Sequence, residues 1–288
     1  MSRRREVDSH RHMLDEIREI MNSMKTLAYI ETRKLMRFLD AQRSVVGTLE
    51  RVGADFLGFY PYPDSQPGAM AHIQLVVGTE RGFCGDFNAS LLRQLDTGLQ
   101  ESRPDAPSVI AVGGRLRSRL EADPRVAVFI EGANVAEEVE RVLSRIVSAL
   151  ARLQPGHGSL TLTVLYREAD SERVLSERLL PPFQALRGTA PAFSHPPELN
   201  LEPATFLSEL TDHYLFASLN QVLYTSLLAE NQIRLQHLDG AVSHLEESLA
   251  EFARQSNVLR QEEITEEIEV IMLSAPVPPH YLRSDDDG

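Results

Sequence analysis

The sequence predicts an α/β protein in which a small central α/β domain is flanked by long N- and C-terminal helices forming an antiparallel coiled coil. Three observations lead to this prediction. All 16 prolines lie between Pro61 and Pro203 or from Pro276 onward, so two long segments contain none. Both proline-free segments carry a seven-residue apolar repeat, and between them short apolar runs alternate with helical patterns.

Residues 1–60 are expected to form the N-terminal coiled-coil helix. Steps of three and four residues give thirteen positions, of which eleven are apolar. A repeat of this length produces a narrow apolar seam along one side of a helix. The positions are Leu14, Ile17, Met21, Met24, Ala28, Glu31, Leu35, Phe38, Gln42, Val45, Leu49, Val52 and Phe56.

Residues 204–275 are expected to form the C-terminal coiled-coil helix. At about 1.5 Å per residue it spans on the order of 100 Å, so much of it must project from a small domain. The segment carries 3 basic and 12 acidic residues, whereas residues 1–60 are slightly basic, which favours pairing of the two arms over two helices of a compact bundle. Its seam consists of Tyr224, Leu228, Asn231, Leu235, Leu238, Val242, Leu245, Leu249 and Phe252.

Residues 68–203 are expected to form the central α/β domain. Helical patterns begin near Asn88, Arg115 and Asn134, and their alternation with strands predicts a mainly parallel sheet. Residues 181–203 are a turn-rich link, and residues 276–288 are an acidic tail. The expected strands are HIQLVVG (72–78), SVIAVGG (108–114), RVAVFIEG (125–132) and SLTLTVLYR (159–167).

Composition excludes several classes of function. A net charge of −13 disfavours a nucleic-acid partner, and the one basic cluster, Arg3–Arg5, fits a solvated tail. The apolar runs are too short to span a membrane, and no apolar signal-peptide core follows the basic start, so we expect an intracellular protein. The single cysteine, Cys84, cannot form an internal disulfide.

The stretch GTERGFCGDFNASLL, residues 78–92, follows an apolar run and precedes a helix, so it is a strand-to-helix turn. Its glycines match neither the dinucleotide fingerprint nor the P-loop, and Asp86 would repel an anion. Cys84 as a nucleophile would need a base, and the nearest histidine in sequence is His72. We therefore favour a structural turn in which Gly82 and Gly85 allow angles or close approaches that a Cβ forbids, with Cys84 as a small buried group.

Two histidine pairs raise the question of a metal site. His10 with His12 and His237 with His244 are spaced by two and seven residues, and neither pair has the ligands to complete a shell. The sequence therefore predicts no catalytic residue, no metal and no cofactor. An enzyme built on the α/β domain remains an alternative that saturable nucleotide binding would favour.

The C-terminal segment carries a pattern that resembles the last helix of the gamma subunit of F-type ATP synthases. The turn at Arg81–Gly85 and Asn88 also resembles that family, with Phe83 in place of leucine. MKTLAYIETRKL (24–35), Val270 and the extension beyond Ala275 depart from it, which is consistent with a divergent member or an alternative F-type ATPase. The C-terminal matches are Glu230, Arg234, Asn257, Arg260, Gln261, Ile264, Thr265, Glu267 and Ile268.

The resemblance implies a non-catalytic rotor shaft that couples ion-driven rotation of a membrane ring to ATP synthesis or hydrolysis. It implies alpha, beta and epsilon subunits and the c-ring as partners, no direct nucleotide binding, and a peripheral place on the cytoplasmic face of the inner membrane. Ile264 and Ile268 are expected in the coiled-coil seam. A coiled-coil scaffold without rotary coupling is the alternative. The implied partner contacts are Arg260, Gln261, Thr265 and Glu267.

Overall fold

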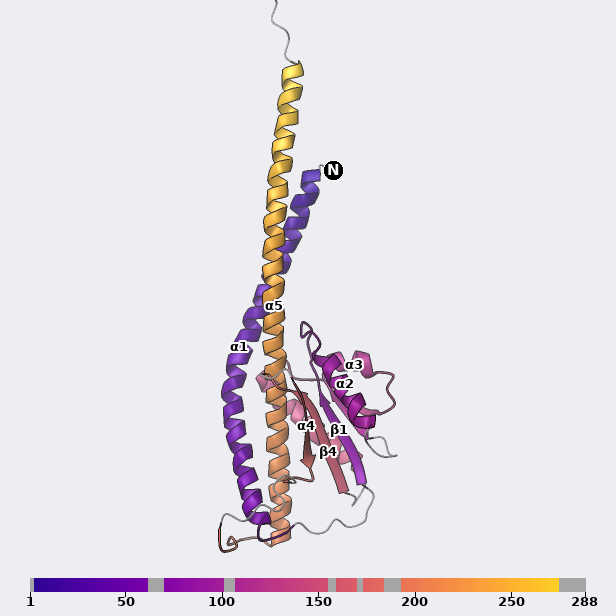
Figure 1. Ribbon diagram of the computed structural model, residues 1–288, viewed down its shortest axis with the longest axis vertical. Coiled ribbons are helices and arrows are strands. Elements are labelled where there is room, and N and C mark those ends of the chain that lie inside the picture. Colours follow the sequence, from indigo (N-terminus) through magenta and orange to yellow (C-terminus); the bar gives the residue numbers. More distant parts are fainter. Residues whose placement is uncertain are drawn as a thin grey trace, which may run out of the picture. The chain divides into compact units, whose positions relative to one another are not determined.

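A computed structural model describes residues 3–61, 70–100, 107–154, 159–169, 173–183 and 193–274 (Figure 1). The predicted tail at 276–288 lies outside the described residues. The chain forms two compact units, one of residues 24–239 and the other of residues 1–23 with 240–288. Two long helices, α1 (Arg3–Leu57) and α5 (Pro203–Ser274), contribute to both units.

The larger unit contains a five-stranded sheet of order β3-β2-β1-β4-β5. The four predicted strands are present, and they pair in parallel. The fifth strand runs antiparallel at the edge and was not predicted, because Glu177 and Arg178 interrupt its apolar pattern. The strands are β1 (Met70–Val77), β2 (Ser108–Val112), β3 (Val126–Ile130), β4 (Ser159–Arg167) and β5 (Val174–Leu180).

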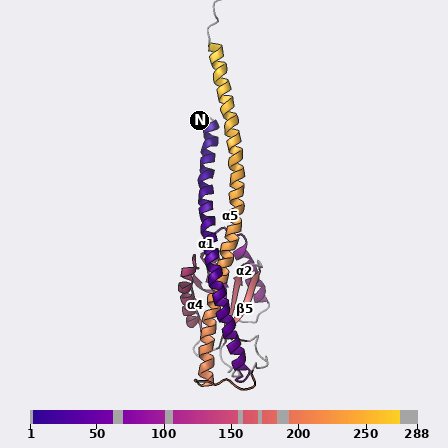
Figure 2. The same ribbon diagram turned by 90° about the vertical axis from the view of Figure 1, so that its left-hand side faces the viewer.

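Helices cover both faces of the sheet. A short 3₁₀ turn (Ala136–Glu138) leads into α4 (Val139–Leu153), which packs on one face with parts of α1 and α5. The opposite face is covered by α2 (Phe87–Gln100) and α3 (Gly114–Leu120) (Figures 1 and 2). Neighbouring residues of β1 separate accordingly, with Leu75 in the first core and Val76 in the second. The three predicted helices of this region are therefore present.

Within the larger unit, α1 and α5 lie side by side and run antiparallel (Figure 2). Phe38 stacks on Tyr224 with ring centres 5.7 Å apart, and Phe56 packs on Phe206 at 5.0 Å. Between these two contacts the residue number rises along α1 and falls along α5, which is the order of an antiparallel coiled coil. The nine predicted seam positions of α5 are all buried or half-buried, and one of them, Tyr224, makes the stacking contact with Phe38.

The predicted seam of α1 is wrong in part, because three positions of its second half are exposed although Gln42, Leu49 and Phe56 are not. Phe38, Val45 and Val52 are 45%, 47% and 38% exposed. The residue that follows each of them in the sequence is buried instead: Leu39, Val46 and Gly53. A straight α-helix has 3.6 residues per turn, so its contact face drifts away from a 3.5-residue repeat. Leu39 belongs to the core beneath the sheet, so this half of α1 packs on the α/β domain as well as on α5.

The smaller unit pairs the first turns of α1 with the later part of α5. The Arg4 guanidinium lies 3.0 Å from the Glu263 carboxylate, and the Ser256 hydroxyl donates to Asp8 at 2.7 Å. This order is also antiparallel. Among the described residues, no helix is long and apolar enough to cross a membrane, and no cluster of three metal-binding side chains occurs.

Candidate functional site

Residues of the turn after β1 form hydrogen bonds with β2 and with each other. The Gly78 N–H donates to the Val112 carbonyl of β2 at 2.9 Å. The side-chain amide of Asn88 accepts from the Thr79 N–H at 3.0 Å and donates to the Thr79 hydroxyl at 2.8 Å. Asn88 thus ties the first turn of α2 to the end of β1, which fixes the path of the residues between them.

Two residues of this turn have left-handed backbone angles. Gly85 has a φ of +52°, and a Cβ there would collide with the imidazole of His237 on α5. Phe83 has a φ of +63°, an uncommon value for a non-glycine residue that the sequence did not indicate. Gly82 is crowded instead, because a Cβ would lie 3.1 Å from the Arg115 guanidinium. The predicted structural role thus has a physical basis at Gly85, whereas at Gly82 the nearby atoms belong to the flexible end of Arg115 and the role stays a prediction.

A buried ion pair on α5 holds the turn. The Glu230 carboxylate accepts N–H bonds from Glu80 at 3.3 Å and Arg81 at 3.1 Å, and it pairs with Arg234. Arg234 in turn donates to the Gly82 carbonyl at 3.2 Å. Both side chains are 5% exposed. Burial raises the pKa of the Glu230 carboxyl, while Arg234 and the two N–H donors oppose that shift. We call Glu230 and Arg234 the turn clamp.

Cys84 lies against the turn clamp. Its thiol is buried, 3.2 Å from the Gly82 carbonyl and 3.5 Å from the Arg234 guanidinium. Burial raises its pKa to about 12, although Arg234 opposes the shift. A thiol that stays protonated at neutral pH is a poor nucleophile, so this environment fits a packing group.

Glu80 occupies the position where doubly wound folds usually place a ligand. Ligands of open parallel sheets bind at the carboxyl ends of the strands. Here one Glu80 carboxylate oxygen accepts the N–H groups of Gly114, after β2, and Gly132, after β3, both at 2.7 Å. Two backbone donors that could hold a phosphate are therefore already bonded to a carboxylate of the same chain. The sequence offered no indication of this role.

Asp86 faces arginines rather than a ligand. Its carboxylate lies 2.9 Å from Arg167 of β4 and 3.4 Å from Arg93 of α2. The hydrogen bond from Arg167 is the main cause that holds the pKa of Asp86 below its usual value. Together with Glu80, Asp86 makes the carboxyl edge of the sheet unfavourable for an anion.

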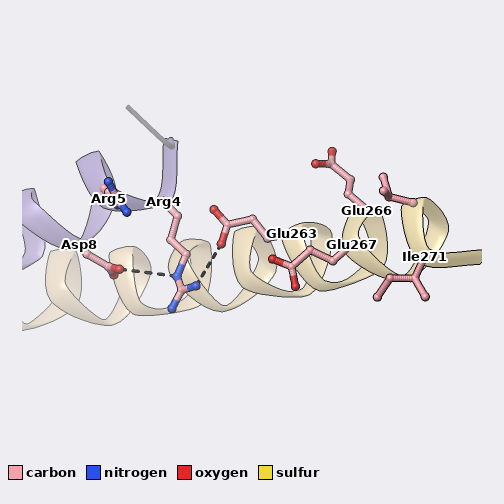
Figure 3. Close-up of a pocket in the computed structure, with 8 residues that line it drawn as sticks. Arg4, Arg5, Asp8, Glu263, Glu266, Glu267 and Ile271 are labelled. Carbon is pink, nitrogen blue, oxygen red and sulfur yellow. Dashed lines mark hydrogen bonds and ion pairs between the residues drawn. The ribbon is translucent and has the colours of Figure 1, made fainter. Parts of the chain in front are cut away.

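The second region of interest is the smaller unit (Figure 3). Charged side chains from the start of α1 and the late turns of α5 line a groove of about 890 Å³. Arg4 lies between the carboxylates of Asp8 and Glu263, at 3.7 and 3.0 Å. Glu266, Glu267 and Ile271 continue the groove along α5 (Figure 3).

The four predicted partner contacts are all exposed on this part of α5. A spacing of seven puts Arg260 and Glu267 on one face, and each lines a groove that Arg4 also lines. A spacing of four puts Gln261 and Thr265 together on another face, where the Thr265 hydroxyl donates to the Gln261 carbonyl at 2.9 Å. Their contact with a partner stays a prediction.

The expected burial of Ile264 and Ile268 in the seam is wrong. Their side chains are 46% and 51% exposed. Glu263 of α5 already pairs with Arg4, at the beginning of the described part of α1, so that part has few residues left to cover the later turns. The exposed apolar end of α5 continues through Val270, Ile271, Met272 and Leu273, which are 65%, 66%, 72% and 87% exposed.

Comparison with known proteins finds relatives along most of the chain. A family model described as ATP synthase matches residues 3–276. This chain belongs to the gamma-subunit family of ATP synthases. The ATP synthase gamma chain of Clostridium beijerinckii is 24% identical over 275 residues, covering 90% of this chain and 92% of that one. The gamma chain of Clostridium botulinum strain Langeland is 23% identical over 264 residues, covering 89% and 91%.

Solved structures with the same fold come from ATP synthase rotors. A chain of the Euglena gracilis mitochondrial ATP synthase rotor superimposes with a TM-score of 0.61 at 14% identity, covering 91% of this gamma-family chain and 98% of that one. A second structure of the same complex, with its F1 sector and c-ring, gives 0.59 at 17% identity and covers 93% and 92%. The family's fold is thus retained in a sequence that has diverged from these relatives.

Proposed function

We propose that this gamma-family chain is the central rotor shaft of an F-type ATP synthase. It couples ion-driven rotation of a membrane ring to ATP synthesis or hydrolysis in a catalytic head. The observation that carries the proposal is the family match over residues 3–276, which includes both long helices and the α/β domain. A coupling shaft has to be stiff, and two helices that share a buried seam provide that stiffness.

The exposed apolar end of α5 supports a partner at the tip of the shaft. Six large apolar side chains there are exposed, and contiguous apolar surface of this kind is typical of a protein-protein contact. The alpha and beta subunits of the catalytic head are the proposed partners of this end. Arg260, Gln261, Thr265 and Glu267 contribute polar contacts from the turns just before it.

The described residues of the α/β domain favour a non-catalytic role. Its strand ends are filled by Glu80 and Asp86, and its cysteine is buried. The chain is therefore proposed as a non-catalytic subunit without a cofactor, nucleotide or nucleic-acid site. Its proposed neighbours at this end are the epsilon subunit and the c-ring, which places it as a peripheral protein on the cytoplasmic face of the inner membrane.

The proposed division of labour follows the expected boundaries. Residues 1–60 and 204–275 form the coiled-coil shaft, residues 68–203 form the attached α/β domain, and residues 276–288 form an acidic tail. Removal of residues 257–288 is expected to leave the α/β domain folded and to lower coupled ATP synthesis. Removal of 276–288 alone is the matched control, because it keeps α5 and the four contact residues.

The decisive experiment is to tag the chain, solubilise its native membranes gently and identify what co-purifies. Recovery of alpha and beta subunits in excess over this chain, together with epsilon and c subunits, supports the shaft. Self-association through exposed apolar side chains favours the alternative, a scaffold without rotary coupling. Recovery of the chain alone or as a homodimer would therefore contradict the rotor proposal.

A further inference from the structure

The outer edge of β3 is an open strand edge. β3 is the first strand in the order β3-β2-β1-β4-β5, and in the described part of the chain no strand pairs with its outer side. Such an edge presents unpaired N–H and C=O groups at the spacing another extended chain requires. Proteins commonly protect edges with lysine or proline, but residues 126–130, VAVFI, contain neither.

A groove of about 430 Å³ runs beside this edge. Its apolar side is formed by Val128, Phe129 and Ile130 of β3. The other side is a stripe of exposed residues on α4, spaced by three, four or one residues so that they share a face. We call these residues the α4 basic stripe: Arg141, Ser144, Arg145, Ser148 and Arg152.

The α4 basic stripe is unusual on a chain with a net charge of −13. Arg145 lies 3.2 Å from Glu131 and Arg141 lies 3.4 Å from Glu138, but Glu131 is 74% exposed. Exposed ion pairs contribute little free energy, so a carboxylate of a ligand can replace them. No ion pair joins Arg152 to another residue within the described ranges. The groove therefore favours an acidic occupant.

The dimensions favour an extended peptide over a single anion. From Arg141 to Arg152 the helix rises about 16 Å, and five strand residues span about 17 Å. Guanidinium groups spread over that length cannot converge on one phosphate. The hydroxyls of Ser144 and Ser148 donate to carbonyls of their own helix at 3.0 and 2.8 Å, so they do not form a phosphate cradle.

We propose that an acidic extended segment of another protein adds to the sheet alongside β3. Its backbone pairs with the open edge, and its carboxylates bind Arg141, Arg145 and Arg152. The carboxylates then lie on the α4 side of the sheet, where Val128 also lies, and the alternate side chains of the segment are apolar and contact Phe129 on the opposite face. Strand addition of this type takes affinity from main-chain hydrogen bonds and specificity from side chains. The proposal is independent of the rotor function.

The test uses the purified full-length chain and a fluorescein-labelled peptide of sequence Asp-Val-Glu-Val-Asp-Val-Glu, followed by fluorescence anisotropy. Saturable binding is expected, and the double variant Arg145→Glu with Arg152→Glu should weaken it by about tenfold or more. The matched control is Arg33→Glu with Arg37→Glu, two exposed arginines of α1, which makes the same charge change and should alter affinity by less than about twofold.

Two N-methylated peptides separate strand addition from simple charge attraction. One peptide is methylated at the odd-numbered backbone nitrogens and the other at the even-numbered ones. Successive N–H groups of a strand point to opposite edges, so only one of these two sets can face β3. One peptide should bind about tenfold more weakly than the parent and the other similarly. Equal binding by both, an equal loss in both double variants, or no saturable binding at about 1 mM would overturn the proposal.

Discussion

Two regions of α5 break the usual rule of burial in opposite directions. Around the turn clamp the helix buries a carboxylate and a guanidinium, each 5% exposed, whereas at Ile271–Leu273 it exposes apolar side chains. Buried charges persist where partners in the same chain satisfy them, and Glu230 and Arg234 have such partners in the turn. The apolar end has none in the described part of the chain. One region is completed by folding, and we propose that the other is completed by assembly.

The largest effect is expected from breaking the turn clamp. Arg234→Met leaves the Glu230 carboxylate buried without its counter-charge, so the free energy of unfolding should fall by about 3–5 kcal/mol. Urea titration of the purified chain measures the change. The double variant Glu230→Leu with Arg234→Met removes both charges and should recover part of the loss. A double variant as unstable as the sum of the two single variants would contradict a mutually dependent pair.

The second-largest loss of stability is expected from a substitution at Gly85, in the turn that the turn clamp holds. Gly85→Ala places a side chain at a left-handed φ against His237, which should destabilise the chain by about 1–3 kcal/mol. Gly240→Ala is the control, because nothing lies within 4 Å of its added Cβ and α5 is helical there. That change should stabilise by about 0.5–1 kcal/mol. Thermal unfolding of both variants tests the contrast, and similar shifts would argue against it.

A smaller, pH-dependent effect is expected at Asp123, just before β3. Hydrogen bonds from the Arg125 side chain, at 2.8 and 3.0 Å, are the main cause that lowers the pKa of the Asp123 carboxyl. A lowered folded-state pKa stabilises the protein above the unfolded value, near 3.9, and that stability is lost as pH falls through the folded value. Asp123→Asn should therefore cost about 1 kcal/mol at pH 7.

The same difference should shrink as the pH falls below about 4, because the Asp123 carboxylate is then protonated first in the unfolded chain and, at still lower pH, in the folded protein. Asp96→Asn is a control at the same arginine, since Asp96 lies 3.1 Å from Arg125 but is 64% exposed. Its effect should stay below about 0.5 kcal/mol. Urea titrations at pH 7 and pH 3.5 measure both variants, and a pH-independent loss in Asp123→Asn would exclude the ion pair as its cause.

The smallest effect on stability is expected at the exposed apolar end. Ile271→Ser with Leu273→Ser removes side chains that contact little in this chain, so the free energy of unfolding should change by less than about 0.5 kcal/mol. Coupled ATP synthesis by the complex in vesicles should nevertheless fall. Glu247→Ser, an exposed change earlier on α5, controls for handling of the complex. A large loss of stability in the double variant would mean that this end is held within the chain.

Much of the fold follows from local patterns. The prolines mark the ends of α1 and α5 because a proline cannot continue a helix, and the four parallel strands are short runs rich in apolar residues. β5 was missed because Glu177 and Arg178 interrupt its apolar pattern, as charged residues can in a strand at the edge of a sheet. The shifted seam at Leu39 was missed because it depends on what α1 packs against, which no repeat in α1 encodes.

The candidate sites were less predictable than the fold. Glycine at position 85 indicated an unusual backbone angle, but nothing in the sequence distinguished Phe83, which shares it. Glu80 could not be assigned, because its partners Gly114 and Gly132 follow two other strands and meet it only in the folded sheet. Ile264 fits a seam by spacing alone, but its burial depends on a partner residue opposite it, which spacing within α5 does not reveal.

The carboxylate of Glu80 has a consequence for a protein that works among nucleotides. A free ligand leaves its site when its concentration falls, but a side chain stays at a fixed effective concentration whatever the surrounding solution contains. In the structure the N–H groups of Gly114 and Gly132 at the strand ends are held by Glu80, and we expect this arrangement to be the same whether ATP, ADP or phosphate is abundant. A rotor subunit whose sheet is insensitive to the nucleotide concentration responds only to torque.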